Sequence, residues 1–76
     1  MVDEDHRLVA IFASIHDVVA GEQVLKDAGL YCDMIPTPSK LSRDCGMSLE
    51  IHSGDRARAE ELWREIGARL VTLVPM

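Results

Sequence analysis

Cysteine and aromatic residues are scarce in this 76-residue chain, which has two cysteines and one each of phenylalanine, tyrosine and tryptophan. Two cysteines are too few for the dense disulfide framework of a small secreted domain. The first residues also lack the basic segment and apolar stretch of a secretory signal peptide. We therefore expect a cytoplasmic protein in a reducing compartment.

Long apolar runs and an excess of positive charge are lacking as well. The longest apolar run, residues 8–13, is far shorter than the roughly 20 residues that a membrane-spanning helix needs. Thirteen acidic residues outnumber eight basic ones, which gives a formal net charge of −5. This charge repels phosphate backbones and anionic membranes, because the basic residues are spread along the chain. We expect neither a nucleic-acid partner nor a membrane partner.

Short stretches with the pattern of a β-strand occur four times. Some are continuous apolar and β-branched runs, as in a buried strand, and others alternate between apolar and polar side chains. The clearest alternation places Met47, Leu49 and Ile51 on one side. The predicted strands are residues 8–13, 30–35, 47–52 and 70–74.

Two segments between these strands have apolar residues at helical spacing. The first helix is predicted at residues 15–28, with Ser14 as its N-cap and Gly29 in the left-handed conformation beyond its end. Gly21 falls on the apolar side of this helix, which indicates a close approach to the sheet. The second helix follows the third strand and places Trp63 in the core.

This order of elements predicts an α+β fold, the ferredoxin-like βαββαβ two-layer sandwich. Right-handed crossovers give the strand order 4-1-3-2 in a mostly antiparallel sheet with both helices on one face. We expect residues 1–76 to form a single domain, with residues 1–6 flexible. Because the first strand is apolar on both sides, some apolar surface should reach the face without helices. A homodimer that covers this face is an expectation.

Cys45 is the residue of the chain best suited to act as a reactive group. Its place just before the third strand brings it towards the start of the first helix, at Ser14 and His16. The N–H groups and the positive dipole end of that helix favour a thiolate. Lys40 and Arg43 add positive charge from the same loop. We expect a lowered pKa for the Cys45 thiol, with His16 as a candidate cation or proton acceptor.

The neighbours of Cys45 act in different ways. Asp44 opposes the thiolate, whereas Gly46 keeps the approach to the sulfur open. A thiolate is the nucleophile in sulfur transfer and disulfide exchange. From these residues alone, the interpretation that Cys45 is simply a small loop residue stays open.

Cys32 is expected to have no chemical role. It is predicted to lie in the middle of a strand, on the same side as Met34, and to pack in the core as a small hydrophobic residue. Its distance from Cys45 should exceed the Cα separation of about 7 Å that a disulfide tolerates, so no internal disulfide is expected. The three histidines show no ligand spacing with the cysteines, so neither a metal nor another cofactor is expected.

Two stretches of the sequence are similar to a known family. Residues 35–46, Ile-Pro-Thr-Pro-Ser-Lys-Leu-Ser-Arg-Asp-Cys-Gly, resemble the central motif of the selenium/sulfur carrier protein-like family of small bacterial proteins. Residues 12–29 look like the first helix of that family, including the positions of Ser14 and His16. Together the two stretches cover about half of the chain.

The resemblance implies that Cys45 is the motif cysteine, with Ser42 and Gly46 as its motif neighbours. The implied function is a carrier, rather than an enzyme with turnover, that holds sulfur or selenium as a persulfide or selenosulfide. Its implied partners are donor and acceptor proteins. Lys40 stands where the family often has arginine, which keeps the charge but loses bidentate hydrogen bonding. The candidate binding residues are Ser14, Lys40, Ser42, Arg43 and Gly46.

Two other classes of function stay open at this point. The same loop would serve a small-ligand or protein-binding module without covalent chemistry, because ferredoxin-like folds host many unrelated functions. A domain that only dimerises is the other alternative. Replacing Cys45 by Ser would abolish carriage but only weaken binding, and it would leave dimerisation unchanged.

Overall fold

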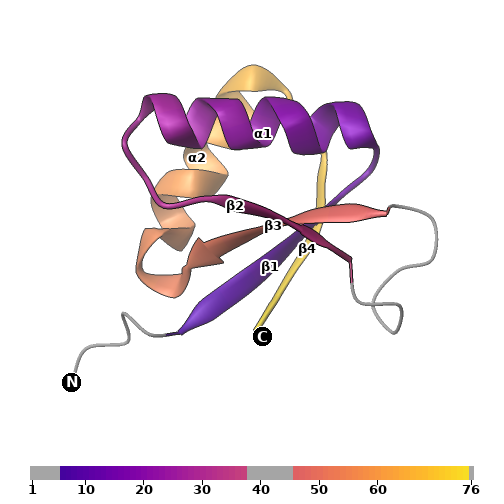
Figure 1. The fold of residues 1–76 in the computed structure, drawn as a ribbon. Coiled ribbons are helices and arrows are strands. Elements are labelled where there is room, and N and C mark those ends of the chain that lie inside the picture. The colour runs from indigo at the N-terminus through magenta and orange to yellow at the C-terminus, as the bar shows by residue number, and fades with distance from the viewer. Residues whose placement is uncertain (1–5, 38–45, 76) are drawn as a thin grey trace.

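The computed structural model describes residues 6–37 and 46–75. The first half of the fold is a strand, a helix and a strand, and the second half repeats this order (Figure 1). A single 3-10 turn, Ser53–Asp55, leads into the second helix. The elements are β1 (Arg7–Phe12), α1 (Ile15–Asp27), β2 (Asp33–Pro36), β3 (Met47–His52), α2 (Arg56–Ile66) and β4 (Leu70–Pro75).

The four strands form one sheet in the order β2-β3-β1-β4, and every neighbouring pair is antiparallel. Both helices lie on the same face of the sheet, so the molecule has two layers (Figure 1). This is the ferredoxin-like α+β fold, and the predicted strand order is confirmed. The register pairs Leu8 with Ile51 in β3 and Val9 with Val74 in β4.

The core lies between the sheet and the two helices. Alternate residues of β1 and β3 point towards the helices, as the two-residue period of a strand requires. Phe12 and Trp63 pack edge to face, with ring centroids 4.9 Å apart, so the predicted core position of Trp63 is confirmed. The residues at the centre of this core are Ala10, Phe12, Val18, Leu25, Leu49, Ile51, Ala59, Leu62 and Trp63.

Gly21 lies at a close approach between α1 and the rest of the core. Its carbonyl accepts a hydrogen bond from Trp63 Nε1 at 3.2 Å. A Cβ atom at this position would lie 3.0 Å from Trp63 Nε1 and 3.2 Å from Leu49 Cδ1 and Phe12 Cζ. The close approach predicted for Gly21 is therefore confirmed, and it is made by side chains from both layers.

The predicted start of β2 at residue 30 is wrong, because the end of α1 uses that residue. The Leu30 N–H donates to the Leu25 carbonyl at 2.9 Å, and Gly29 adopts the predicted left-handed conformation with φ 79°. These bonds close the helix, so the chain pairs with β3 only from Asp33. Cys32 therefore precedes the strand and does not lie in its middle.

The first strand also differs from its prediction. It begins at Arg7 and ends at Phe12, one residue earlier at each end. Its alternate residues Val9 and Ile11 point to the face without helices, yet only 2% and 4% of their surfaces are exposed. The expectation that β1 leaves apolar surface exposed on that face is wrong for both residues. The homodimer stays a prediction, without support from these two side chains.

Two further predictions concern the flexibility of residues 1–6 and the lack of a membrane-spanning helix. Of the residues predicted to be flexible, 1–5 lie outside the described part of the chain, and the His6 carbonyl accepts a hydrogen bond from the Ser53 N–H at 3.1 Å. Among residues 6–37 and 46–75, neither helix has the length and apolar character needed to cross a bilayer.

Candidate functional site

Several element ends meet at one end of the sheet. Because β1 and β2 are both antiparallel to β3, β1 and β2 end where β3 begins, and β4 begins at this end too. The first helix starts directly after β1, so Ser14 lies at the same end as Thr37 and Gly46 (right-hand side of Figure 1). These two residues flank the segment 38–45, which contains the motif cysteine. The topology thus places the start of α1 at the end of the sheet to which both ends of that segment are attached.

The start of α1 is built by Ser14 and Asp17. Ser14 is in an extended conformation, and its Oγ accepts a hydrogen bond from the Asp17 N–H at 3.4 Å. The same hydroxyl lies 3.2 Å from Asp17 Oδ2 and donates to that carboxylate. The predicted N-cap is confirmed, and the Ser14 side chain has a structural task at the helix start.

Arg69 joins the start of β4 to the start of α1. Its Nε lies 3.1 Å from Asp17 Oδ2, and its carbonyl accepts a hydrogen bond from the Ala13 N–H at 2.9 Å. The Asp17 side chain is only 14% exposed, whereas the Arg69 side chain is 70% exposed. A cation is therefore held at the candidate site by both its backbone and its side chain. Arg69 was not among the residues predicted for the site.

The stem of the β2–β3 hairpin is closed by polar contacts. The Thr37 N–H donates to the Gly46 carbonyl at 3.0 Å. The hydroxyls of Thr37 and Ser48 form a hydrogen bond, and Ser48 is fully buried. These contacts hold the two residues on either side of segment 38–45 together.

Only some of the residues predicted to carry the chemistry lie in the described part of the structure. His16 is exposed in the first turn of α1, and Gly46 is exposed just before β3. Among the described residues, no interaction joins His16 to Gly46. The other four predicted residues, Lys40, Ser42, Arg43 and Cys45, lie outside the described residues.

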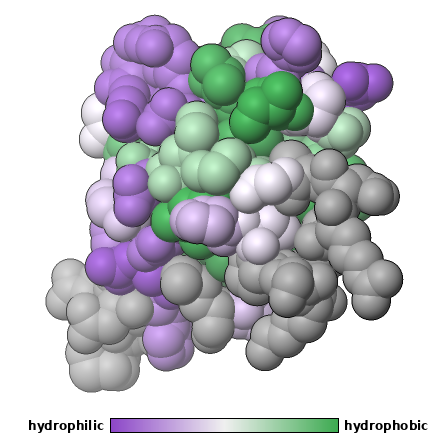
Figure 2. Space-filling model, turned by 45° about the vertical axis from the view of Figure 1, so that its right-hand side comes forward, coloured by the Kyte–Doolittle hydropathy of each residue, from purple (hydrophilic) through white to green (hydrophobic). Residues whose placement is uncertain are grey.

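Apolar side chains are exposed beside His16. Ile15 and Val19 lie one helical turn apart on α1, with 46% and 51% of their surfaces exposed. Figure 2 shows apolar surface near the top of this side of the molecule, bordered by hydrophilic side chains. Two exposed apolar side chains are common on a protein surface and do not by themselves indicate a contact with another protein.

Cys32 is a free thiol that packs in the core, as predicted. Burial is the main cause that raises its pKa to about 12. The negative charges of Glu22 and Asp33 contribute in the same direction, while Lys26 acts in the opposite sense. At neutral pH this group is a protonated thiol, and a thiol is a poor nucleophile. Cys32 is thus unsuited to sulfur chemistry.

A second polar cluster lies on the face of the sheet without helices. The Nε of Arg7 lies 2.9 Å from Glu50 Oε2, and the Tyr31 hydroxyl donates to the same oxygen at 3.4 Å. The Tyr31 ring packs against His52, with ring centroids 4.5 Å apart, and beneath the Arg7 guanidinium. This cluster holds the segment before β2 against the sheet, at the end where β1 begins. It lies at the opposite end of β1 from the start of α1.

Metal ligands do not gather in the described part of the chain. Among residues 6–37 and 46–75, no three side chains of His, Cys, Asp or Glu are grouped so as to hold an ion. Segment 38–45 is not among these residues.

A comparison with protein families matched residues 7–74 to the family described as "Putative Se/S carrier protein-like". The match begins with β1 and reaches into β4, and so covers far more than half of the chain. The chain belongs to this family. Comparison with curated proteins and with solved structures found no match.

Membership of the Se/S carrier protein-like family confirms the resemblance read from residues 12–29 and 35–46. The matched span also takes in α2 and most of β4. Cys45 and its motif neighbours lie within the matched span. Their chemical roles are taken up below as a proposal.

Proposed function

We propose that this protein is a carrier of sulfur or selenium, and that Cys45 is the residue that holds the cargo. The observation that carries this proposal is the family match over residues 7–74, a span that contains Cys45. The partners are a donor protein and an acceptor protein in the cytoplasm. The protein itself catalyses no reaction on the cargo. It accepts one atom from the donor and delivers it to the acceptor.

The proposed transfer uses the thiolate of Cys45 as a nucleophile. This thiolate attacks the outer sulfur of a donor persulfide, R–S–SH, and the donor S–S bond breaks as the new bond forms. The donor leaves as R–S⁻, and Cys45 becomes Cys–S–SH, so no external oxidant or reductant is needed. A donor that carries R–S–SeH loads Cys45 as the selenosulfide in the same way. An acceptor thiolate then removes the outer atom and restores the Cys45 thiolate.

The architecture around the start of α1 supports this chemistry. The positive end of the helix dipole favours an anion, and the Arg69 side chain adds a cation at the same end of the sheet, although Asp17 lies beside it. His16 is exposed and is the candidate proton acceptor. Ser14, Lys40, Ser42, Arg43 and Gly46 are proposed to contact the cargo or the partner.

The first test is the rate of alkylation of the two cysteines as a function of pH, read by peptide mass spectrometry on the folded protein. A carrier cysteine needs a thiolate near neutral pH, so the pKa of Cys45 should lie well below its reference value of about 8.5. Cys32 is an internal control, because burial and its raised pKa should keep it protected. A Cys45 pKa at or above the reference value would argue against the carrier proposal and favour a non-covalent binding module.

The second test is carriage itself. After incubation with a cysteine desulfurase and cysteine, the intact mass should rise by one sulfur atom, and a reductant should remove it. The increase should vanish in Cys45→Ser and persist in Cys32→Ser, which tests the same substitution at the buried cysteine. If Cys45→Ser still gains the sulfur, or if repeated loading of the wild-type protein fails, the carrier proposal is wrong.

A further inference from the structure

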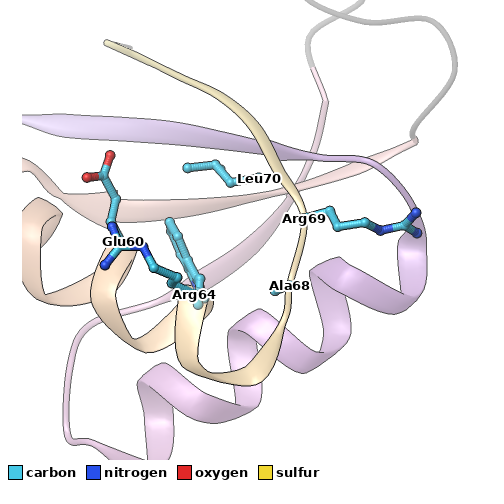
Figure 3. A pocket seen from close by; sticks show the side chains of 6 residues that line it. Glu60, Arg64, Ala68, Arg69 and Leu70 are labelled. Atoms are coloured by element: carbon cyan, nitrogen blue, oxygen red, sulfur yellow. The ribbon is translucent and has the colours of Figure 1, made fainter.

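A groove lies between α2 and the beginning of β4 (Figure 3). Its cavity has a volume of about 410 Å³ and is open to solvent on one side. In Figure 3, Glu60 and Arg64 come from α2, while Ala68, Arg69 and Leu70 come from the segment that leads into β4. The lining residues are Glu60, Trp63, Arg64, Ala68, Arg69 and Leu70.

The strand beside this groove is apolar and lies at the edge of the sheet. Among the described strands, β4 is last in the order β2-β3-β1-β4 and has β1 as its only neighbour. None of its six residues is charged, and Val71, at the irregularity opposite β1, is 64% exposed. Leu70 and Leu73 both pack against the core, so the apolar side of the strand continues beyond the cavity.

The register shows which backbone groups of β4 point outwards. The Ser53 N–H donates to His6, so His6, Leu8 and Ala10 direct their backbone bonds towards β3. Val9 and Ile11 therefore bond to β4, where their partners are Val74 and Thr72.

Leu73 lies between these two partners. Its N–H and C=O consequently point away from β1, towards the open edge. An outward N–H and C=O pair on an edge strand is a template for another strand.

The other edge of the sheet is less suited to accept a strand. It is formed by β2, which has only four residues and contains Asp33 and Pro36. Short length, a charged side chain and proline are the features by which edge strands avoid pairing. The two edges are therefore not equivalent.

The rim of the groove carries one uncompensated cation. Glu60 lies 3.3 Å from the Nε of Arg56, and Arg69 pairs with Asp17. In Figure 3, the Arg69 side chain points away from the cavity, towards the start of α1. Within residues 6–37 and 46–75, Arg64 has no ion-pair partner. A carboxylate bound in the groove would supply one.

We propose that this groove binds an extended segment of a partner protein, which adds a strand to β4. Its main chain bonds to Leu73, one of its apolar side chains enters the cavity, and a carboxylate pairs with Arg64. Peptide recognition by strand addition combines main-chain hydrogen bonds with pockets for alternate side chains in this way. A second copy of this chain fits less well, because its β4 carries no acidic side chain. The proposal does not depend on the chemistry of Cys45.

The test uses a displayed library of random dodecapeptides, selected on the full-length wild-type protein. We expect the enriched peptides to share alternating apolar residues and at least one Asp or Glu. Trp63 is the only tryptophan of the chain and lines the groove, so a synthetic enriched peptide should change the intrinsic fluorescence. In NMR spectra of the amides, the Leu73 signal should shift on binding.

Two substitutions at exposed positions separate the parts of the site. Val71→Lys places a charge at the open edge and should weaken peptide binding about tenfold or more. Arg64→Gln removes the cation, and the loss of a charge-assisted hydrogen bond should also weaken binding about tenfold. The matched controls are Val19→Lys, on an exposed valine of α1, and Arg58→Gln, on the α2 arginine that pairs with Glu61 at 3.0 Å. Both controls should bind like the wild type.

Three results would overturn the proposal. One is a selection that enriches no peptide whose binding depends on both Val71 and Arg64. Another is a peptide that binds without any shift of the Leu73 amide. The third is self-association of the free protein through β4, seen as Leu73 shifts that depend on protein concentration and vanish in Val71→Lys, because the occupant would then be a second copy.

Discussion

Arg69 and Asp17 lie 52 positions apart in the sequence, yet the Nε of Arg69 is 3.1 Å from Oδ2 of Asp17. The pair joins the beginning of β4 to the first turn of α1. The hydrogen bond from the Ala13 N–H to the Arg69 carbonyl supports the same junction through the backbone. The helix start at the candidate site is thus held by a strand that is last in the chain.

A double-mutant cycle should measure this junction. With Asp17→Asn, Arg69→Ala and the double variant, we expect a coupling energy of about 0.2 to 1 kcal/mol in urea unfolding, because the arginine is largely exposed. The coupling should shrink in high salt, since salt screens exposed charges. A matching cycle on Arg58 and Glu61, both exposed on α2, should give a smaller value. Zero coupling at low salt would mean that the observed contact does not persist in solution.

The cap of α1 should contribute measurably to stability. Replacing Ser14 by Ala removes the acceptor for the Asp17 N–H and should lower the free energy of unfolding by about 1 kcal/mol. Ser14→Asp restores an acceptor and should recover much of this loss, and Ser14→Gly should cost only a few tenths of a kcal/mol. If Ala and Asp variants unfold at the same urea concentration, the hydrogen bond is not what stabilises the helix start.

Gly21 should resist replacement although it lies in a helix. Alanine has the higher helix propensity, by about 1 kcal/mol. Its Cβ would, however, meet three side chains at 3.0 to 3.2 Å, and two of them, Phe12 and Trp63, are buried and packed against each other. Overpacking of this kind costs about 1 to 3 kcal/mol, so Gly21→Ala should be destabilising by about 1 kcal/mol.

Gly54→Ala is the matched control for this substitution. A Cβ there meets nothing within 4 Å, so its effect on the urea midpoint should be close to zero. An increase in stability of Gly21→Ala over the wild type would show that Trp63 and Phe12 yield more readily than their packing indicates.

Cys32 should make the stability of the protein fall at alkaline pH. Its pKa is raised from 9.0 to about 12 in the folded state, so the unfolded chain loses this proton first as the pH rises. The unfolded state then binds fewer protons than the native state, and stability falls by up to about 1.4 kcal/mol per pH unit between pH 9 and 12. Below pH 9 this contribution is fully present.

The measurement compares urea unfolding of the wild type and of Cys32→Ala at several pH values. The variant loses packing at every pH, but its stability should decline less steeply above pH 9, because the other titrating groups are common to both proteins. Parallel curves would show that the Cys32 thiol ionises with similar ease in the folded and unfolded states.

Much of the fold follows from local sequence patterns. Met47, Leu49 and Ile51 alternate with polar residues, and this two-residue period placed β3 correctly. Ser14 capped the predicted helix because a hydroxyl before a helical stretch satisfies a free N–H group. The start of β2 was missed because the N–H of Leu30 is used to close α1, a choice that strand patterning does not reveal.

The candidate site was only partly predictable. The motif around Cys45 and its family were read from the sequence, since a motif consists of residues that are close in the chain. Arg69 was missed because nothing near residue 69 indicates a contact with Asp17. The role of Ser48 was also hidden, because a serine in an alternating strand is expected at the surface, whereas here it is buried beside Thr37.

The sequence by itself determined the order of strands and helices, the cap at Ser14 and the core position of Trp63, because periods of 2.0 and 3.6 residues and capping preferences act between near neighbours in the chain. Only the tertiary structure decided that Arg69 meets Asp17, that Val9 and Ile11 are buried, and that a groove opens between α2 and β4. The physical reason is that each of these features depends on packing between segments that are far apart in the sequence.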